Sequence, residues 1–198
     1  MSAAQAHRDD VRSVKGRISP EAFRHVFRHH PAGVAVVTAD AGNGPVAMTV
    51  SSVASVGLHP PTLVFSASAR SSATPVIRRV ETLVVHLLSS ADIELAKLGA
   101  HSGVDRFGPE VEWARLPTGE PYYSRAGSWL RGRVVERVDA HGSTLLIVEA
   151  IESSDRSDQG RTEAKPLVYH DRSWYVLDEH SRLWDTAVPF LTVYGRGE

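Results

Sequence analysis

Two different spacings of apolar residues divide the chain near residue 31. Between positions 22 and 27 the apolar residues recur at helical spacing, and Ser19 followed by Pro20 is typical of a capped helix start. Pro31 cannot continue a helix. The pattern therefore predicts a helix over about 20–30.

After that helix, apolar residues alternate or form short β-branched runs, which are typical of strands. Residues 41–44, Ala-Gly-Asn-Gly, predict a hairpin loop, and helices are expected at about 72–80 and, capped by Ser90, at about 91–98. So few helices among so many strands favour a closed antiparallel barrel with helical insertions over a doubly wound α/β fold. The strands are expected at 34–38, 46–56, 62–66, 83–88, 128–138, 144–151, 166–170 and 174–177.

The 198 residues fit one domain, which we expect to span 18–178. Residues 1–17 are polar and aperiodic, so we expect a flexible N-terminal arm there. The polar segment 153–165 is expected to be an exposed hairpin loop. The tail, 179–198, is rich in apolar residues and is expected to pack on the domain or on a partner subunit.

Composition excludes several classes of function. The net charge of −1 gives no overall field for nucleic acid, and no apolar run is long enough to cross a membrane. The absence of cysteine excludes thiolate catalysis, disulfides and iron–sulfur clusters, so redox chemistry would need an organic cofactor. The N-terminus lacks the apolar stretch of a signal peptide, so a cytoplasmic protein is expected.

A metal site is not expected, although the chain has ten histidines. His25 and His29 stand at i, i+4 and could share one helix face, but no third ligand lies at a supporting spacing. A basic exposed face explains the pair without a metal. Walker, GxGxxG, GxSxG and HExxH motifs are absent as well.

The segment 44–74 carries the strongest chemical signal. Small residues at Ala47, Thr49, Ser51 and Ser52 would let a planar ring approach the backbone, although a half-exposed edge strand would also explain them. Residues 66–74, SASARSSAT, place five hydroxyls and one arginine where a strand leads into a helix, which suits a phosphate, or a capped helix with a polar loop. Together the two halves suggest a mononucleotide such as FMN.

The order of several segments carries a family resemblance: FRHVFRHHPAGVAVVT, GPVAMTVSSVASVGLHPPTLVFSAS, TLVVHLLS, DRF, and PLVYHDRSWY. From about Ser19 to Leu177 the chain resembles the flavin reductase-like, FMN-binding split-barrel family. The resemblance implies a mainly β, Greek-key split barrel with a few short helices, a homodimer, and NAD(P)H-dependent reduction of FMN or FAD. It also implies a possible monooxygenase partner that receives the reduced flavin.

The resemblance also implies which residues contact the nucleotides. The isoalloxazine and ribityl chain would lie beside Pro45, Val46, Ala47, Met48, Thr49, Ser51, Ser52, Ser66, Ala67 and Ser68. The phosphate would be held by Arg70, Ser71, Ser72 and Thr74. Arg106 and Phe107 match the basic residue and the Phe that the family has in this loop. Pro166 and Leu167 would contact the nicotinamide nucleotide.

Three departures from the family bear on nicotinamide use. Many members have Gly-Asp-His where this chain has Gly142-Ser143-Thr144, and His141 is a candidate catalytic substitute that strand alternation would aim at another face. Many members have a basic residue and Phe at 98–99, and Asn where this chain has His86. A buried, hydrogen-bonding histidine explains the last of these.

Hydride transfer asks little of protein side chains, so these departures leave an NAD(P)H:flavin oxidoreductase as the favoured function. Two alternatives remain at this stage. One is an FMN-binding protein that holds its flavin tightly for other redox chemistry or carries it without using nicotinamides. The other is a structural or interaction barrel, in which the small-residue strand and the hydroxyl-rich turn would coincide by chance.

Overall fold

The computed structural model describes residues 17–154 and 164–182. Helix α1 (Pro20–Arg28) begins where the sequence predicts, because the Ser19 hydroxyl accepts a hydrogen bond from the Ala22 N–H at 3.1 Å. The expected N-terminal arm, except Arg17, lies outside the described residues. So do most of the 153–165 loop and the apolar part of the tail, Trp184, Phe190 and Tyr194 included.

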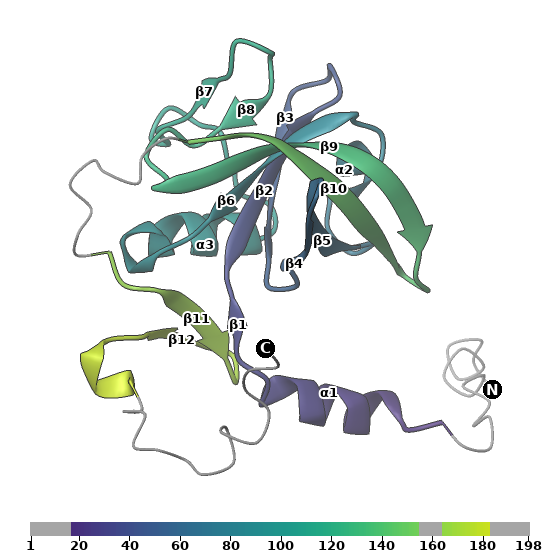
Figure 1. Ribbon diagram of the computed structural model, residues 1–198, viewed down its shortest axis with the longest axis vertical. Coiled ribbons are helices and arrows are strands. Elements are labelled where there is room, and N and C mark those ends of the chain that lie inside the picture. Colours follow the sequence, from purple (N-terminus) through teal and green to yellow (C-terminus); the bar gives the residue numbers. More distant parts are fainter. Residues whose placement is uncertain (1–16, 155–163, 183–198) are drawn as a thin grey trace, which may run out of the picture.

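Seven antiparallel strands form the main sheet, and its shape follows from one short connection. The two edge strands, β3 and β4, are joined by residues 51–53 alone, and three residues reach across no more than roughly 14 Å. The sheet must therefore roll until its two edges lie near each other, and Figure 1 shows the rolled sheet. In spatial order its strands are β3 (Pro45–Val50), β2 (Ala35–Asp40), β6 (Thr82–Leu87), β9 (Ser128–Asp139), β10 (Ser143–Ser153), β5 (Pro61–Ser68) and β4 (Ala54–Leu58).

The expected mainly β fold with few short helices is confirmed, but three local predictions are wrong. The single strand expected over 46–56 is two strands, because the chain crosses from one edge of the sheet to the other at 51–53. The helix expected over 72–80 is the single turn α2 (Thr74–Ile77). Ser89 rather than Ser90 is the capping serine, and it caps the short 3₁₀ turn that leads into the next helix, since its hydroxyl and N–H donate to the Asp92 carboxylate.

Several short elements escaped the sequence patterns. The turn η1 (Ser90–Asp92) leads into α3 (Ile93–Ala100), and β7 (Ala114–Arg115) pairs with β8 (Pro121–Tyr122). A separate three-stranded sheet joins β1 (Ala32–Gly33) to β11 (Leu167–His170) and β12 (Ser173–Val176), and η2 (Glu179–Ser181) follows it. In Figure 1 this sheet lies beside α1, below the rolled sheet.

Strand β2 is buried on both faces and separates two apolar cores. Val37 faces the interior of the rolled sheet, where it joins Phe65 and Leu146. Val36 faces the other side, where it joins Ala96 of α3 and Tyr123 after β8. The second core matters for function, because it supports the loop that carries Arg106 and Phe107.

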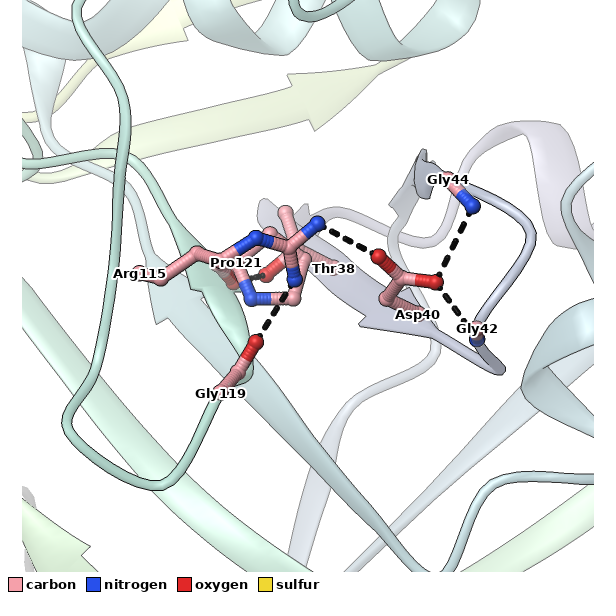
Figure 2. Close-up of polar contacts among 7 residues, drawn as sticks. All are labelled: Thr38, Asp40, Gly42, Gly44, Arg115, Gly119 and Pro121. Carbon is pink, nitrogen blue, oxygen red and sulfur yellow. Dashed lines mark hydrogen bonds and ion pairs between the residues drawn. The ribbon is translucent and has the colours of Figure 1, made fainter.

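The loop between β2 and β3 is fixed by the Asp40 carboxylate (Figure 2). This carboxylate accepts hydrogen bonds from the N–H groups of Gly42 (2.7 Å) and Gly44 (3.2 Å) and from the Arg115 guanidinium (2.6 Å). Partial burial raises the pKa of Asp40, but these bonds outweigh it and lower the pKa below the usual range. Gly42 and Gly44 have φ of +94° and +105°, which favours glycine. The predicted hairpin loop at 41–44 is confirmed, and it fixes where β3 begins.

A second polar cluster holds the β7–β8 hairpin against the sheet. The Glu120 carboxylate, only 6% exposed, accepts a hydrogen bond from Arg131 Nε at 2.7 Å and another from the Thr118 hydroxyl. The Thr38 hydroxyl donates to the Pro121 carbonyl at 2.5 Å. Burial raises the pKa of Glu120, but hydrogen bonds to Thr118, Thr82 and Arg131 overcome this and lower it to about 2.

Candidate functional site

A recess of about 230 Å³ lies at the start of β3. Three segments that are distant in sequence form it: the first residues of β3, the turn before α2, and the loop 104–107. Six residues expected to bind the cofactor meet here. They are Pro45, Val46, Ala47, Ser72, Arg106 and Phe107.

Arg106 gives this recess an unused hydrogen-bond donor. One guanidinium nitrogen donates to the His101 carbonyl, whereas Nε is buried and is without a partner among the described residues. Ser72 lines the same recess and is exposed. A cationic N–H and a hydroxyl at one small recess suit an anionic or strongly accepting group, and a phosphate monoester is one. The Asp105 carboxylate also lines the recess, but it accepts a hydrogen bond from the Phe107 N–H at 2.9 Å, so the Arg106 and Ser72 donors remain to fit the phosphate of a flavin nucleotide.

A buried stack supports the loop that carries Arg106 and Phe107. The Phe107 ring stacks on the Tyr123 ring, with centroids 5.4 Å apart and 14° between the planes. The Tyr123 hydroxyl donates to the Arg106 carbonyl at 3.0 Å, and Trp113 Nε1 donates to the Phe107 carbonyl at 2.8 Å. Burial raises the pKa of Tyr123 above its ordinary value, so the hydroxyl stays a donor.

His86 connects this stack to the centre of the sheet. Its Nδ1 lies 3.0 Å from the Val36 carbonyl, and its Nε2 lies 3.0 Å from the Tyr123 N–H. These partners require a proton on Nδ1 and a lone pair on Nε2, so the ring is neutral. Burial lowers the pKa of His86 to about 4, which agrees with that state. The histidine at this family position is thus a buried, hydrogen-bonded residue that positions the loop.

A strip of unpaired strand edge runs away from the recess. Strand β3 pairs only with β2, and β4 pairs only with residues 61–64 of β5, so β3 and residues 66–68 of β5 face each other without a ladder in the part of the chain the structure describes. Ser52 crosses this split, because its hydroxyl accepts from the Ser66 N–H at 2.9 Å. Pro45 and Ser51 are six positions apart along extended chain, which corresponds to roughly 20 Å. The strip therefore suits a long, thin ligand.

Other expected contact residues use their side chains elsewhere. Met48 and Ala67 point into the core of the rolled sheet. The Thr49 hydroxyl donates to the Ala96 carbonyl of α3 at 2.7 Å, and the Thr74 hydroxyl donates to the Ser68 carbonyl at 2.6 Å. These side chains are therefore engaged within the protein and are not offered to a ligand.

The departure at 98–99 has a packing reason. A Cβ added at Gly99 would lie 2.4 Å from Thr49 Oγ1 and 3.0 Å from the Thr49 backbone nitrogen. Glycine at position 99 therefore lets α3 approach β3 closely.

The turn between β5 and α2 holds the remaining hydroxyls. The Ser71 hydroxyl accepts from the Ala73 N–H at 3.3 Å, and the Ser68 hydroxyl accepts from the Arg70 N–H at 3.3 Å. Ser72 and Arg70 are the exposed polar residues of this turn. They are the side chains best placed to meet an anion from solvent.

His141 occupies the tight turn between β9 and β10. Its φ is +45°, that of Gly142 is +97°, and the Gly142 carbonyl accepts from the Ala69 N–H at 2.9 Å. This turn therefore lies beside the β5–α2 turn, at the Ser72 end of the strip. Thr144, which stands where the family has histidine, is buried. Contact between His141 and the nicotinamide remains a prediction.

Pro166 and Leu167 lie at the start of β11, outside the lining of the recess. The Pro166 carbonyl accepts from the Leu177 N–H at 3.1 Å, and Leu167 is buried in the second core. Their expected contact with the nicotinamide nucleotide also remains a prediction.

A larger hollow of about 710 Å³, here called the α1 groove, lies at the opposite end of the strip. It lies between α1, β1, residues 51–54 and the β11–β12 hairpin, and both Ser51 and Ser52 line it. Sequence reasoning missed this groove, because its walls come from opposite ends of the chain. The spacing of Arg24 and Arg28 on one helix was the available signal.

Two histidines of α1 lie close together, and one of them lies near His170 of β11. The rings of His25 and His29 lie 5.1 Å apart, and that of His170 lies 6.2 Å from His29. In the described ranges, no group of three or more histidine or acidic side chains is placed to hold a metal ion. The helices of those ranges are also too short or too polar to span a membrane.

Comparison with known proteins gives one consistent family. The model of the flavin reductase like domain matches residues 27–178. An NADH:FMN oxidoreductase of Rhodococcus erythropolis is 37% identical over 153 residues, which cover 77% of this chain and 79% of that protein. The reductase component of a Pseudomonas aeruginosa 4-hydroxyphenylacetate 3-monooxygenase is 29% identical over 162 residues, which cover 79% of this chain and 91% of that protein.

Solved structures agree with the sequence relatives. The flavin reductase domain protein from Arthrobacter sp. FB24 superposes with a TM-score of 0.72 at 29% identity, covering 80% of this chain and 95% of that chain. The flavin reductase HpaC, solved in complex with NADP⁺, superposes with a TM-score of 0.71 at 25% identity, covering 80% of this chain and 98% of that chain.

Proposed function

The chain belongs to the flavin reductase-like family, and we propose that it transfers hydride from NADH or NADPH to FMN or FAD bound along the β3–β5 strip. The observation that carries this proposal is the recess at the start of β3, where the unpaired Arg106 Nε and the Ser72 hydroxyl can donate hydrogen bonds to an anion. The relatives named NADH:FMN oxidoreductase support the reaction.

A bound flavin supplies a hydride acceptor at its N5 position, so the chain needs no acid or base at the reacting atoms. The residues of this chain bind the flavin and orient it. Ser72 and Arg106 hold the phosphate by charge-assisted hydrogen bonds. The backbone of 45–49 and the hydroxyls of Ser51 and Ser52 border the ribityl chain and ring. The stacked Phe107 and Tyr123 keep the Arg106 loop in place.

We further infer a homodimer. Helix α1 buries none of its residues in this chain, and it exposes a large apolar surface. On this helix Val26 is 66% exposed, and Phe23 and Phe27 are 52% and 56% exposed; Ile18, just before the helix, is also 66% exposed. Such a surface on a nine-residue helix needs a cover, and a second copy of the chain supplies one. Sedimentation of the flavin-loaded protein tests this, and a species with the mass of one chain at micromolar concentration would contradict it.

A partner monooxygenase is the proposed destination of the reduced flavin. Similarity to the reductase component of a two-component 4-hydroxyphenylacetate 3-monooxygenase supports this role. Such a role needs a flavin that leaves the strip after reduction.

One assay tests the reaction itself. The purified protein is mixed with NADH or NADPH and with FMN, FAD or riboflavin, and nicotinamide absorbance is followed. We expect oxidation of at least one nicotinamide that depends on added flavin. A yellow protein that is inert to both nicotinamides would support the alternative, in which a tightly held flavin serves other chemistry.

A further inference from the structure

We propose that His86 is a positioning residue for the flavin phosphate, which it affects through Tyr123 and Arg106 without touching the ligand. This inference rests on the proposed function, because it explains how the chain keeps a phosphate donor of the recess in place. His86 lies in β6, is fully buried, and is not among the residues that line the recess. Its effect on the phosphate must therefore pass through other residues.

The first link joins the sheet to the segment after β8. The His86 Nδ1–H donates to the Val36 carbonyl, and Nε2 accepts from the Tyr123 N–H, both at 3.0 Å. All three residues are fully buried, so a lost partner would leave a polar group unsatisfied. One imidazole therefore fixes the backbone of Tyr123 relative to β2.

The second link joins Tyr123 to the loop that carries Arg106. The Tyr123 hydroxyl donates to the Arg106 carbonyl at 3.0 Å. Residues 101–113 contain no helix or strand, so this bond, the Phe107 stack and the bond from Trp113 Nε1 determine the path of the loop. They place Arg106 at the recess, with a buried Nε that has no partner among the described residues.

A fixed loop matters for the phosphate more than for the rest of the flavin. Ordering an arginine side chain costs conformational entropy, and a loop that already holds Arg106 in place removes that cost from ligand binding. Under the proposed function the ring and the ribityl chain lie along β3 and residues 66–68, away from this loop. Loosening the loop should therefore weaken FMN more than riboflavin, which lacks the phosphate.

The length of the side chain makes the first link dependent on histidine. The amide of asparagine stands at the same number of bonds from Cβ as Nδ1, and that of glutamine at the same number as Nε2. Both amides supply a donor and an acceptor. His86→Asn should therefore keep the bond to the Val36 carbonyl and lose the bond to the Tyr123 N–H, whereas His86→Gln restores an acceptor for that N–H.

The test measures FMN and riboflavin affinities by fluorescence titration in four variants. His86→Asn and His86→Gln address the first link, and Tyr123→Phe removes only the hydroxyl of the second. Val148→Ala is the control, because it opens a cavity at a fully buried position of β10 in the core of the rolled sheet. Both ligands bind the folded protein, so a general loss of stability lowers both affinities by the same factor and leaves their ratio unchanged.

We expect His86→Asn and Tyr123→Phe each to weaken FMN about fivefold relative to riboflavin, whereas His86→Gln and Val148→Ala keep the ratio within about twofold of wild type. Urea denaturation shows whether each variant is folded. Tyr123→Phe keeps the ring stack and the bond to His86 Nε2, so it decides the test if the His86 variants do not fold.

Two results would overturn the proposal. One is an FMN-to-riboflavin ratio that stays at the wild-type value in both His86→Asn and Tyr123→Phe. The other is an equal change of that ratio in His86→Asn and His86→Gln, which would make the histidine a packing residue. A wild-type protein that binds FMN no more tightly than riboflavin would instead refute the phosphate site of the proposed function, so the two failures are distinguishable.

Discussion

The two ends of the β3–β5 strip are built in opposite ways. At the recess, the Arg106 loop rests on His86 and Tyr123, both fully buried and both hydrogen-bonded. At the α1 groove, the walls are exposed side chains such as Phe27 and Arg172, and α1 meets the hairpin through a backbone bond and an exposed ion pair between Asp171 and Arg28. The recess is therefore set by the folded core, whereas the groove is set by surface charge.

This difference suits ligands with different residence times at the two ends of the strip. Breaking a buried hydrogen bond leaves an unsatisfied polar group, so the recess keeps its shape without a ligand. Exposed charges are screened by salt and attract anions without a fixed geometry. We expect an anion at the groove to bind weakly and to exchange quickly, and the flavin phosphate at the recess to be held more tightly.

The largest expected effect comes from removing the support of the recess. Tyr123→Leu deletes a fully buried ring and its bond to the Arg106 carbonyl, so it should lower the free energy of unfolding by about 4 kcal/mol. Urea denaturation measures this. Tyr175→Leu, at a ring 47% exposed beside the groove, should change it by less than about 1 kcal/mol. Equal losses of stability in the two variants would contradict the difference in burial between the two ends of the strip.

The second prediction concerns acid. Burial lowers the pKa of His86 from 6.5 to about 4, so between these pH values the imidazole binds a proton in the unfolded chain but not in the folded protein. Stability from His86 is thus complete above pH 6.5 and is lost as the pH falls toward 4, by about 3 kcal/mol. Glu120, with a pKa lowered from 4.5 to about 2, adds a separate loss only below about pH 4.5.

Urea titrations between pH 7.5 and 4.5 check this prediction. His86→Asn should flatten the dependence in that range, although it lowers stability at neutral pH. His25→Asn, at an exposed histidine of α1, should leave the slope as in wild type. A slope that survives His86→Asn would mean that another group carries the acid sensitivity.

A third, smaller effect separates the phosphate from the rest of the flavin. Ser72→Ala and Arg106→Gln should each weaken FMN about tenfold, because a charge-assisted hydrogen bond contributes about 1.5–3 kcal/mol. Riboflavin, which lacks the phosphate, should lose little. Fluorescence titration with both ligands measures the ratio, and Ser128→Ala, at an exposed serine starting β9, is the control. Equal weakening of FMN and riboflavin would place the phosphate elsewhere.

The smallest effect is expected at His141. It lies in a tight turn beside the β5–α2 turn, so His141→Ala should change stability by only a few tenths of a kcal/mol and leave flavin reduction near wild type. Stopped-flow reduction of the flavin-loaded variant is the measurement. A tenfold slower reduction, about 1.4 kcal/mol in barrier, would show that the histidine acts on the nicotinamide.

Features that depend on neighbouring residues could be predicted from the sequence. The Ser19 cap, the glycines of the 41–44 loop and the hydroxyl-rich turn near Ser72 all follow from local chemistry. Arg106 is predicted from the family resemblance, because the spacing of residues in the sequence does not indicate that it lies at the recess. These signals led to the correct fold class and to one end of the strip.

Features that depend on contacts between distant segments could not be predicted. The break at 51–53 follows from the roll of the whole sheet, and a local pattern of alternating residues continues through it. The bond between His86 and the Tyr123 N–H joins residues 37 positions apart. The α1 groove joins α1 to the β11–β12 hairpin, more than a hundred residues later.

Because β3 and β5 are not paired, a flavin bound between them would form part of the barrel wall. In the described ranges this edge is crossed by the Ser52 side chain instead of a ladder of backbone bonds, so the barrel should open here first. Hydrogen exchange at the amides of 46–49 and 67–68 should be faster than along β2 and β6. A flavin lying in the split would occupy the place of a missing strand, slow that exchange and raise the melting temperature with its concentration.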